Sequence, residues 1–103
     1  MDAMLILATF KLGEVVISDA CGKRVLPERL GQCLRLHGNC DWGPFVKDAD
    51  KASNNENAKK PKGKIFSIYR IDDSKKDDGI DNKFYILTEA DRSRTHIILP
   101  TDQ

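Results

Sequence analysis

Residues 83–100, KFYILTEADRSRTHIILP, decide the fold class of this chain. Two runs rich in β-branched, aromatic and aliphatic residues, 84–87 and 96–99, flank a charged segment at 89–94. Residues of these types favour strands, and a charged segment between two strands is typical of a solvated turn. The stretch therefore predicts a β-hairpin with a charged connection.

Segments ahead of the hairpin predict further strands. In residues 64–71, KIFSIYRI, the side chains alternate between two faces with the period of two that a strand requires. EVVIS at 14–18 is also β-prone, whereas AMLILA at 3–8 suits either a strand or a helix. Because consecutive strands with short connections most simply form a meander, we expect the last three strands to pair antiparallel.

The clearest helix prediction covers residues 27–38. Pro27 suits a first helical turn, where its missing N–H would have no partner, and Gly38 suits the end. A stripe of side chains recurs at three- and four-residue intervals: Leu26, Leu30, Cys33, Leu34 and His37. Residues 48–60 are polar throughout, and their asparagines predict only a weak helix on the surface.

Together these elements predict a single α+β domain of two layers over residues 1–103. We expect a small antiparallel sheet, made of the C-terminal three-strand meander plus the N-terminal strand, packed against one or two helices. Residues 1–9 are expected to form an N-terminal extension or a strand, and residues 72–82 an exposed hairpin loop. A chain of 103 residues suits one compact domain.

Composition narrows the class of function. Charged residues make up 32% of the chain but the formal net charge is only +1, which argues against a protein that holds nucleic acid by a broadly basic face. No apolar run approaches the ~20 residues of a membrane-spanning helix. Because three cysteines fit poorly with a closed disulfide framework, we expect reduced thiols and a cytoplasmic protein without membrane association.

Three residues are candidates for a metal site. Cys33, His37 and Cys40 follow a C-x3-H-x2-C spacing, and Cys21 could supply a fourth zinc ligand. The spacing matches none of the usual paired-cysteine patterns. Cys33 also lies on the apolar stripe of the predicted helix, where a free cysteine acts as a small hydrophobe. We therefore expect no metal and no cofactor.

Two catalytic arrangements can be written from the sequence. Cys40 with His37 or His96 could form a nucleophile and base, although nothing in the sequence brings them together. Glu89 and Asp91 could hold Mg2+ or act as acid and base, but the segment lacks the lysine spacing of a nuclease. In the alternative interpretation, which we favour, Asp91 caps the turn through the backbone. The sequence leans against an enzyme.

A recognition surface is the remaining candidate. Trp, Tyr and Arg residues dominate binding interfaces, although they also dominate small cores. The candidate binding residues are Asp41, Trp42, Glu89, Asp91, Arg92 and Arg94. An exposed Arg92 beside Trp42 would assign the charged turn to binding, whereas a buried and fully paired Arg92 would assign it to the architecture of the fold.

Four segments together resemble a known family: LGEVVIS (12–18), CDWG (40–43), FSIY (66–69) and FYILTEADRSRTHIILP (84–100). The family consists of short bacterial proteins, usually labelled plasmid-related, that are found on plasmids, integrative elements and integron cassettes. This chain departs from the family pattern at Leu36, Pro44, Lys64, Tyr85 and the ending at 101–103. The resemblance implies an accessory protein of mobile DNA and attaches no activity to it.

Three functions of different classes remain open. The preferred one is a small cytoplasmic protein that acts through protein–protein contact. The second is a nucleic-acid-binding modulator that uses Arg29, Arg35, Arg92 and Arg94, with binding that weakens as salt rises. The third is a metal-dependent hydrolase at the two carboxylates of the charged turn. The oligomeric state also stays open, because an exposed edge strand could pair with a second copy.

Overall fold

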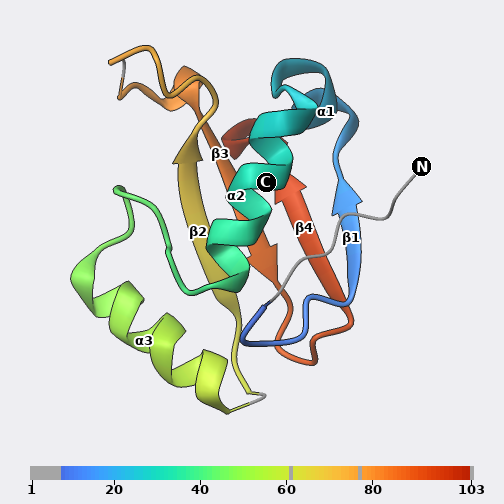
Figure 1. Cartoon of the computed structure of the whole chain (residues 1–103), viewed down its shortest axis with the longest axis vertical. Coiled ribbons are helices and arrows are strands. Elements are labelled where there is room, and N and C mark those ends of the chain that lie inside the picture. Colours follow the sequence, from blue (N-terminus) through green and yellow to red (C-terminus); the bar gives the residue numbers. More distant parts are fainter. Residues whose placement is uncertain (1–7, 61, 77, 103) are drawn as a thin grey trace.

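The computed structural model describes residues 8–60, 62–76 and 78–102 (Figure 1). Within this part of the chain, the sheet contains β1 (Glu14–Ile17), β2 (Ile65–Arg70), β3 (Lys83–Thr88) and β4 (Arg94–Ile98). The helices are α1 (Asp19–Arg24), α2 (Pro27–Gly38), α3 (Asp48–Lys59) and the short 3-10 helices η1 (Ile80–Asn82) and η2 (Pro100–Asp102). The prediction of a two-layer α+β domain is confirmed. Most of the predicted N-terminal segment, residues 1–7, lies outside the described residues.

The strands follow the order β1-β4-β3-β2. β2, β3 and β4 pair antiparallel in sequence order, as a meander does. β1 joins the outside of β4 in parallel, with Val16 opposite His96, so the complete sheet is mixed rather than purely antiparallel. Parallel pairing is available to β1 because the chain passes through all three α-helices and the other two strands before it reaches β4.

The helical layer differs from the prediction at α1 and α3. The Ser18 hydroxyl accepts a hydrogen bond from Cys21 N, and this side-chain cap begins the short helix α1, which the sequence did not predict. At α3, the structure contains a regular helix of 12 residues where the sequence predicted only a weak one. Asn54 and Asn57 direct their amides to the backbone of residues 64–66 instead of competing for their own helix. Tertiary contacts therefore compensate for the low helix propensity of this segment.

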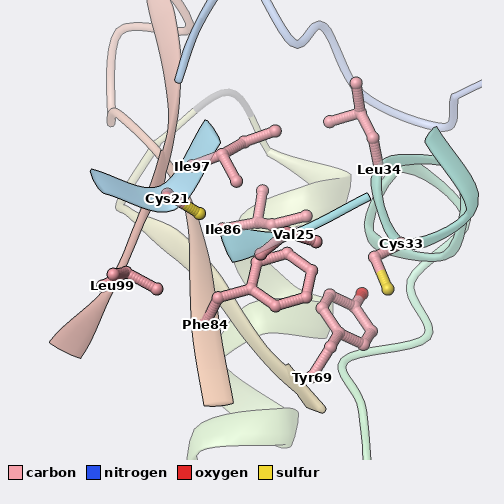
Figure 2. Close-up of a cluster of buried hydrophobic side chains, with 9 residues drawn as sticks. All are labelled: Cys21, Val25, Cys33, Leu34, Tyr69, Phe84, Ile86, Ile97 and Leu99. Carbon is pink, nitrogen blue, oxygen red and sulfur yellow. The ribbon is translucent and has the colours of Figure 1, made fainter. Parts of the chain in front are cut away.

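Helix α2 lies across one face of the sheet, and the main core fills the space between them (Figure 1). Tyr69 and Phe84 lie side by side on neighbouring strands, with ring centroids 5.9 Å apart (Figure 2). The buried members of this core are Cys21, Val25, Cys33, Leu34, Tyr69, Phe84, Ile86, Ile97 and Leu99. A smaller second cluster contains Phe10, Trp42, Val46 and Ile65. Every second residue of β2 and β3 is buried, which is the alternation expected from the sequence.

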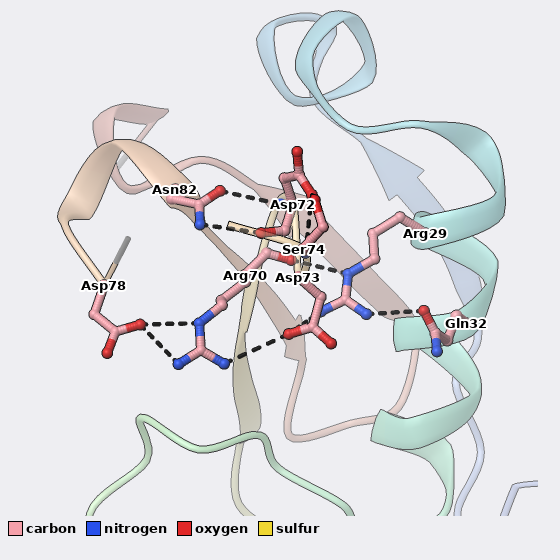
Figure 3. A network of polar contacts seen from close by, with 8 residues as sticks. All are labelled: Arg29, Gln32, Arg70, Asp72, Asp73, Ser74, Asp78 and Asn82. Atoms are coloured by element: carbon pink, nitrogen blue, oxygen red, sulfur yellow. Dashed lines mark hydrogen bonds and ion pairs between the residues drawn. The ribbon is translucent and has the colours of Figure 1, made fainter. Parts of the chain in front are cut away.

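The connection between β2 and β3 is an exposed, charged loop (Figure 3). Arg70, at the end of β2, forms ion pairs with Asp78 at 2.7 Å and with Asp73 at 3.5 Å. The Asp72 carboxylate accepts hydrogen bonds from the Ser74 hydroxyl and backbone N–H, which lower the pKa of Asp72. Because these carboxylates are largely solvated, the ion pairs contribute little to the stability of the fold.

Candidate binding surface

The charged turn between β3 and β4 is built around Arg92. This residue is 5% exposed and has a backbone φ of +61°. Its guanidinium donates hydrogen bonds of 2.6–3.3 Å to carbonyl oxygens of described residues: Asn57, Lys60, Gly63, Glu89 and Ala90. Burial lowers the pKa of the guanidinium. Arg92 thus joins the turn to the C-terminal end of α3, where the helix dipole favours a cation.

Gly13 and Asp91 support the same turn. Gly13 has a φ of +69°, and a Cβ atom there would lie 2.4 Å from the Arg92 carbonyl oxygen, so no larger residue fits. The Asp91 carboxylate accepts hydrogen bonds from the Ser93 hydroxyl at 2.6 Å and from its backbone N–H at 3.0 Å, and these bonds lower the pKa of Asp91. Asp91 therefore acts on its own turn, as aspartate commonly does.

Glu89 and Arg94 form separate polar contacts that reach solvent. Glu89 Oε2 lies 2.8 Å from His96 Nε2, and Arg94 Nε lies 3.3 Å from Glu14 Oε1. The side chains of Arg94 and Glu14 are 58% and 68% exposed. Of the four candidates in the turn, Asp91 and Arg94 are exposed and Glu89 is half-buried, whereas Arg92 is buried.

Trp42 belongs to the second cluster. It is 3% exposed, and its indole N–H donates a hydrogen bond to Asn55 Oδ1 at 3.0 Å. Beside it, Gly43 has a φ of +86°, and a Cβ atom there would lie 2.0 Å from Ile68 O. Asp41 is exposed at the start of the same turn. The DWG turn is therefore packed directly against β2, and Trp42 is not available as an interface anchor.

Cys33, His37 and Cys40 do not converge. The Cys33 thiol lies in the main core, where burial raises its pKa to about 12 (Figure 2). The Cys40 sulfur lies 3.1 Å from the Thr9 hydroxyl, at the border of the second cluster. Within the described ranges, no three Cys, His, Asp or Glu side chains are grouped so that they could hold a metal ion.

His37 instead belongs to a buried chain of hydroxyl groups that crosses the sheet. Its Nδ1 lies 2.5 Å from Ser67 Oγ on β2, and its Nε2 lies 2.8 Å from Thr88 Oγ1 on β3. Thr88 Oγ1 lies 2.8 Å from Thr95 Oγ1 on β4, and the Thr95 hydroxyl donates to the Leu12 carbonyl at 2.6 Å. All four side chains are fully buried.

The hydrogen bond from Thr95 to Leu12, at one end of this series of hydroxyl groups, determines where each proton lies. Because a hydroxyl carries one proton, Thr95, which donates to Leu12, must accept from Thr88. Thr88 must then accept from His37, so His37 carries its proton on Nε2 and accepts from Ser67 at Nδ1. Burial lowers the pKa of His37 to about 3, which keeps the ring neutral. His37 therefore links three strands inside the core and does not face a substrate.

The outer face of the sheet, on the side away from α2, offers a different kind of surface. Its side chains alternate with the buried ones along β2, β3 and β4 and are half-buried. A shallow hollow of about 460 Å³ on this face is lined by Lys64, Phe66, Ile68, Tyr85, Leu87 and Ile98. The last five of these residues form the outer apolar face.

A sequence signal for the outer apolar face exists. A strand with one solvated face normally carries polar residues there, whereas strands covered on both faces are apolar on both. In β2 and β3, the outward positions Phe66, Ile68, Tyr85 and Leu87 are apolar, and so are the inward ones apart from two buried hydroxyl residues, Ser67 and Thr88. The sequence prediction relied on charged and aromatic residues of two turns and did not include this face. Two of those residues, Trp42 and Arg92, are buried by contacts with residues far along the chain.

No helix in the described part of the chain is long and apolar enough to cross a membrane. The role of the outer apolar face has to be inferred from its geometry and chemistry. Comparison of the chain with protein-family models, with curated proteins and with solved structures found no match.

Proposed function

We propose that this chain is a small binding protein that contacts a protein partner through the outer apolar face. The observation that carries the proposal is a continuous set of apolar side chains from three neighbouring strands, lining a hollow open to solvent. Contiguous apolar surface on a folded domain is typical of interaction sites. Of the six candidates chosen from the sequence, Trp42 and Arg92 are buried, so the proposed surface differs from the predicted one.

The composition of this surface supports a protein partner. Interfaces combine an apolar centre with a polar rim, and Tyr and Phe are frequent in the centre. Here Tyr85 and Leu87 lie at the centre on β3, while Lys64 lines the hollow. His96 is opposite Leu87 in the sheet and lies within hydrogen-bond distance of Glu89, so these two polar side chains add to the polar rim.

The biological setting in the proposal rests on the sequence resemblance alone. An accessory protein of a mobile genetic element would act on a factor of its host or of a competing element, and contact with that factor requires an accessible surface. The outer apolar face supplies such a surface.

The test is a pull-down from bacterial lysate with three forms of the chain. Leu87→Lys places a charge in the hollow, whereas Ile80→Lys changes an apolar residue that is 56% exposed and does not line it. We expect at least one protein to be enriched by the wild type and by Ile80→Lys but not by Leu87→Lys. Equal enrichment of the protein by Leu87→Lys would contradict the proposal. So would a wild type that enriches no protein above background. Circular dichroism checks that each variant is folded.

A second function is favoured by one specific observation. Phe66 and Tyr85 lie on adjacent strands of the outer apolar face with Lys64 beside them, and aromatic rings on an open sheet can stack on the bases of single-stranded nucleic acid. Fluorescence anisotropy with single-stranded RNA and DNA tests this. Binding that weakens with salt and with Tyr85→Ala would support it, and no binding at low salt would eliminate it.

A further inference from the structure

The two edges of the sheet are closed to different degrees. Along the free edge of β2, asparagine side chains of α3 bond to the strand backbone. Asn54 Nδ2 donates to Phe66 O at 2.7 Å, and Asn54 Oδ1 accepts from Phe66 N at 3.2 Å. One turn later, Asn57 Nδ2 donates to Lys64 O at 3.0 Å. These amides occupy the positions that a neighbouring strand would use.

The rest of the β2 edge is closed in the same way. Ile68 N donates to the Trp42 carbonyl at 3.1 Å, and Arg29 Nε donates to Arg70 O at 2.9 Å. Every second residue of β2 thus bonds outward to a side chain or a loop. A further strand could pair here only by displacing these groups.

The edge at β1 is open in the described structure. Glu14 N and Ser18 N each donate to a carbonyl on the β4 side at 3.0 Å, so alternate residues between them bond toward β4. The N–H and C=O groups of Val15 and Ile17 consequently point away from β4, and no described residue bonds to them. Val15, Val16 and Ile17 are 38%, 39% and 42% exposed. An apolar edge with unpaired backbone groups is a template for another strand.

We propose that the β1 edge pairs antiparallel with the β1 edge of a second copy of this chain. A register centred on Val16 places Val15 of each copy opposite Ile17 of the other, so the outward groups of both residues exchange hydrogen bonds. The two-fold axis is then normal to the sheet, which keeps α2 of both copies on the same face. Because β1 is an edge strand, the two four-stranded sheets would then form one continuous sheet.

Charges at the two ends of β1 fit the antiparallel direction. Lys11 precedes the strand, and Arg94 begins β4 beside the first residue of β1, Glu14, with which it forms an ion pair at 3.3 Å. At the other end, Asp19 follows the strand and Asp102 accepts a hydrogen bond from the Ser18 hydroxyl. Because Arg94 is already paired with Glu14, the attraction comes from Lys11, which an antiparallel pair brings toward Asp19 of the other copy. A parallel pair would place like charges together.

Amide exchange with deuterium, followed by NMR at low and high concentration of the full chain, tests the register. The amides of Val15 and Ile17 are expected to exchange rapidly when the chain is dilute and to be protected when it is concentrated. The Ser18 amide, which bonds toward β4, is expected to be protected in both cases. Protection of Val15 and Ile17 already in the dilute monomer would mean that another segment of the same chain occupies the edge, and would overturn the proposal.

Sedimentation of the full chain over the same concentrations tests the association. We expect a monomer–dimer equilibrium that Val15→Pro weakens by at least roughly tenfold, because it removes an outward N–H that no described residue uses. Ile17→Lys should do the same by charging the edge, and Ile80→Lys, at an apolar residue that is more exposed than Ile17 and lies outside the edge, should not. A wild type that stays monomeric, or a dimer that survives both edge variants, overturns the proposal.

The proposal for the β1 edge and the proposal for the outer apolar face can be tested separately. Leu87→Lys is expected to dimerise normally while losing its protein partner. Val15→Pro is expected to keep the protein partner while losing the dimer. Sedimentation and the pull-down, applied to both variants, therefore separate a failure of self-association from a failure of the proposed function.

Discussion

The two edge strands of this sheet differ in what satisfies their backbone groups. On β2, Asn54 and Asn57 supply side-chain amides, while on β1 the outward groups of Val15 and Ile17 meet no described residue. The same asparagines lower the intrinsic helix propensity of α3. Residues that look unfavourable for local structure thus protect one edge of the sheet from further pairing. Among the described residues, none plays this part at β1, and this distinguishes the edge that we propose to be an interface.

The largest expected effect comes from removing the residue that holds α3 in place. Arg92→Ala leaves the carbonyls of Asn57, Lys60 and Gly63 without their donor, so the free energy of unfolding should fall by about 3–5 kcal/mol. Arg94→Ala, on the exposed side of the same turn, should change it by less than about 1 kcal/mol. Denaturant unfolding measures both, and equal losses would contradict a structural role for Arg92.

A more selective change opens the β2 edge. Asn54→Ala leaves the N–H and C=O of Phe66 without partners, so we expect a loss of about 2 kcal/mol. The Phe66 amide should also exchange faster with deuterium, which would make this edge resemble β1. Ser53→Ala, at the exposed neighbouring position of α3, is the control and should change stability by less than about 0.5 kcal/mol. An unchanged exchange rate at Phe66 would argue against the amide contacts.

Unfolding at lower pH tests the role of His37 in the buried hydrogen bonds that link β2 to β4. The pKa of His37 falls from 6.5 to about 3 on folding, so the unfolded chain binds a proton before the folded one does. Stability from this group is complete above pH 6.5 and is lost as pH falls toward 3, by about 2 kcal/mol at pH 5. Unfolding measured between pH 7 and pH 5 should show this slope in the wild type and a flatter one in His37→Gln. Identical slopes would place the titration elsewhere.

The smallest effect is expected at the open edge itself. Ile17 and Ile97 are opposite one another in the sheet, but Ile17 is 42% exposed and Ile97 only 1%. In dilute solution, Ile17→Ala should reduce the free energy of unfolding by less than about 1 kcal/mol, and Ile97→Ala by about 3 kcal/mol. Thermal unfolding at low protein concentration compares the two. A large loss for Ile17→Ala would show that β1 is covered in the monomer.

Several elements could be predicted because their signals are local. The alternation in residues 64–71 and the stripe from Leu26 to His37 arise from repeats of two and of about 3.6 residues, which any short window contains. Helix α1 was missed because its start depends on one hydroxyl cap at Ser18. Helix α3 was underestimated because Asn54 and Asn57 have their partners in another element.

The candidate site was harder to predict, because it depends on burial. Aromatic and arginine side chains serve cores and interfaces equally, and nothing in the sequence around Trp42 or Arg92 separates the two uses. The half-buried residues of the outer apolar face could have been recognised from strands that are apolar on both sides. The open edge at β1 could not have been recognised from the sequence, because it depends on whether any other segment bonds to the outward backbone groups of the strand.

Short-range chemistry alone accounts for the strands of the meander, the start of α2 at Pro27 and the turn at Asp91, since each depends on neighbours within a few positions. Long-range contacts were needed for the direction of β1, the burial of Arg92 and the proton position on His37. Arg92 meets Gly63 from 29 positions away, and Thr95 meets Leu12 from 83. Such contacts form only when the strands and helices have assembled, so the local pattern of residues does not indicate them.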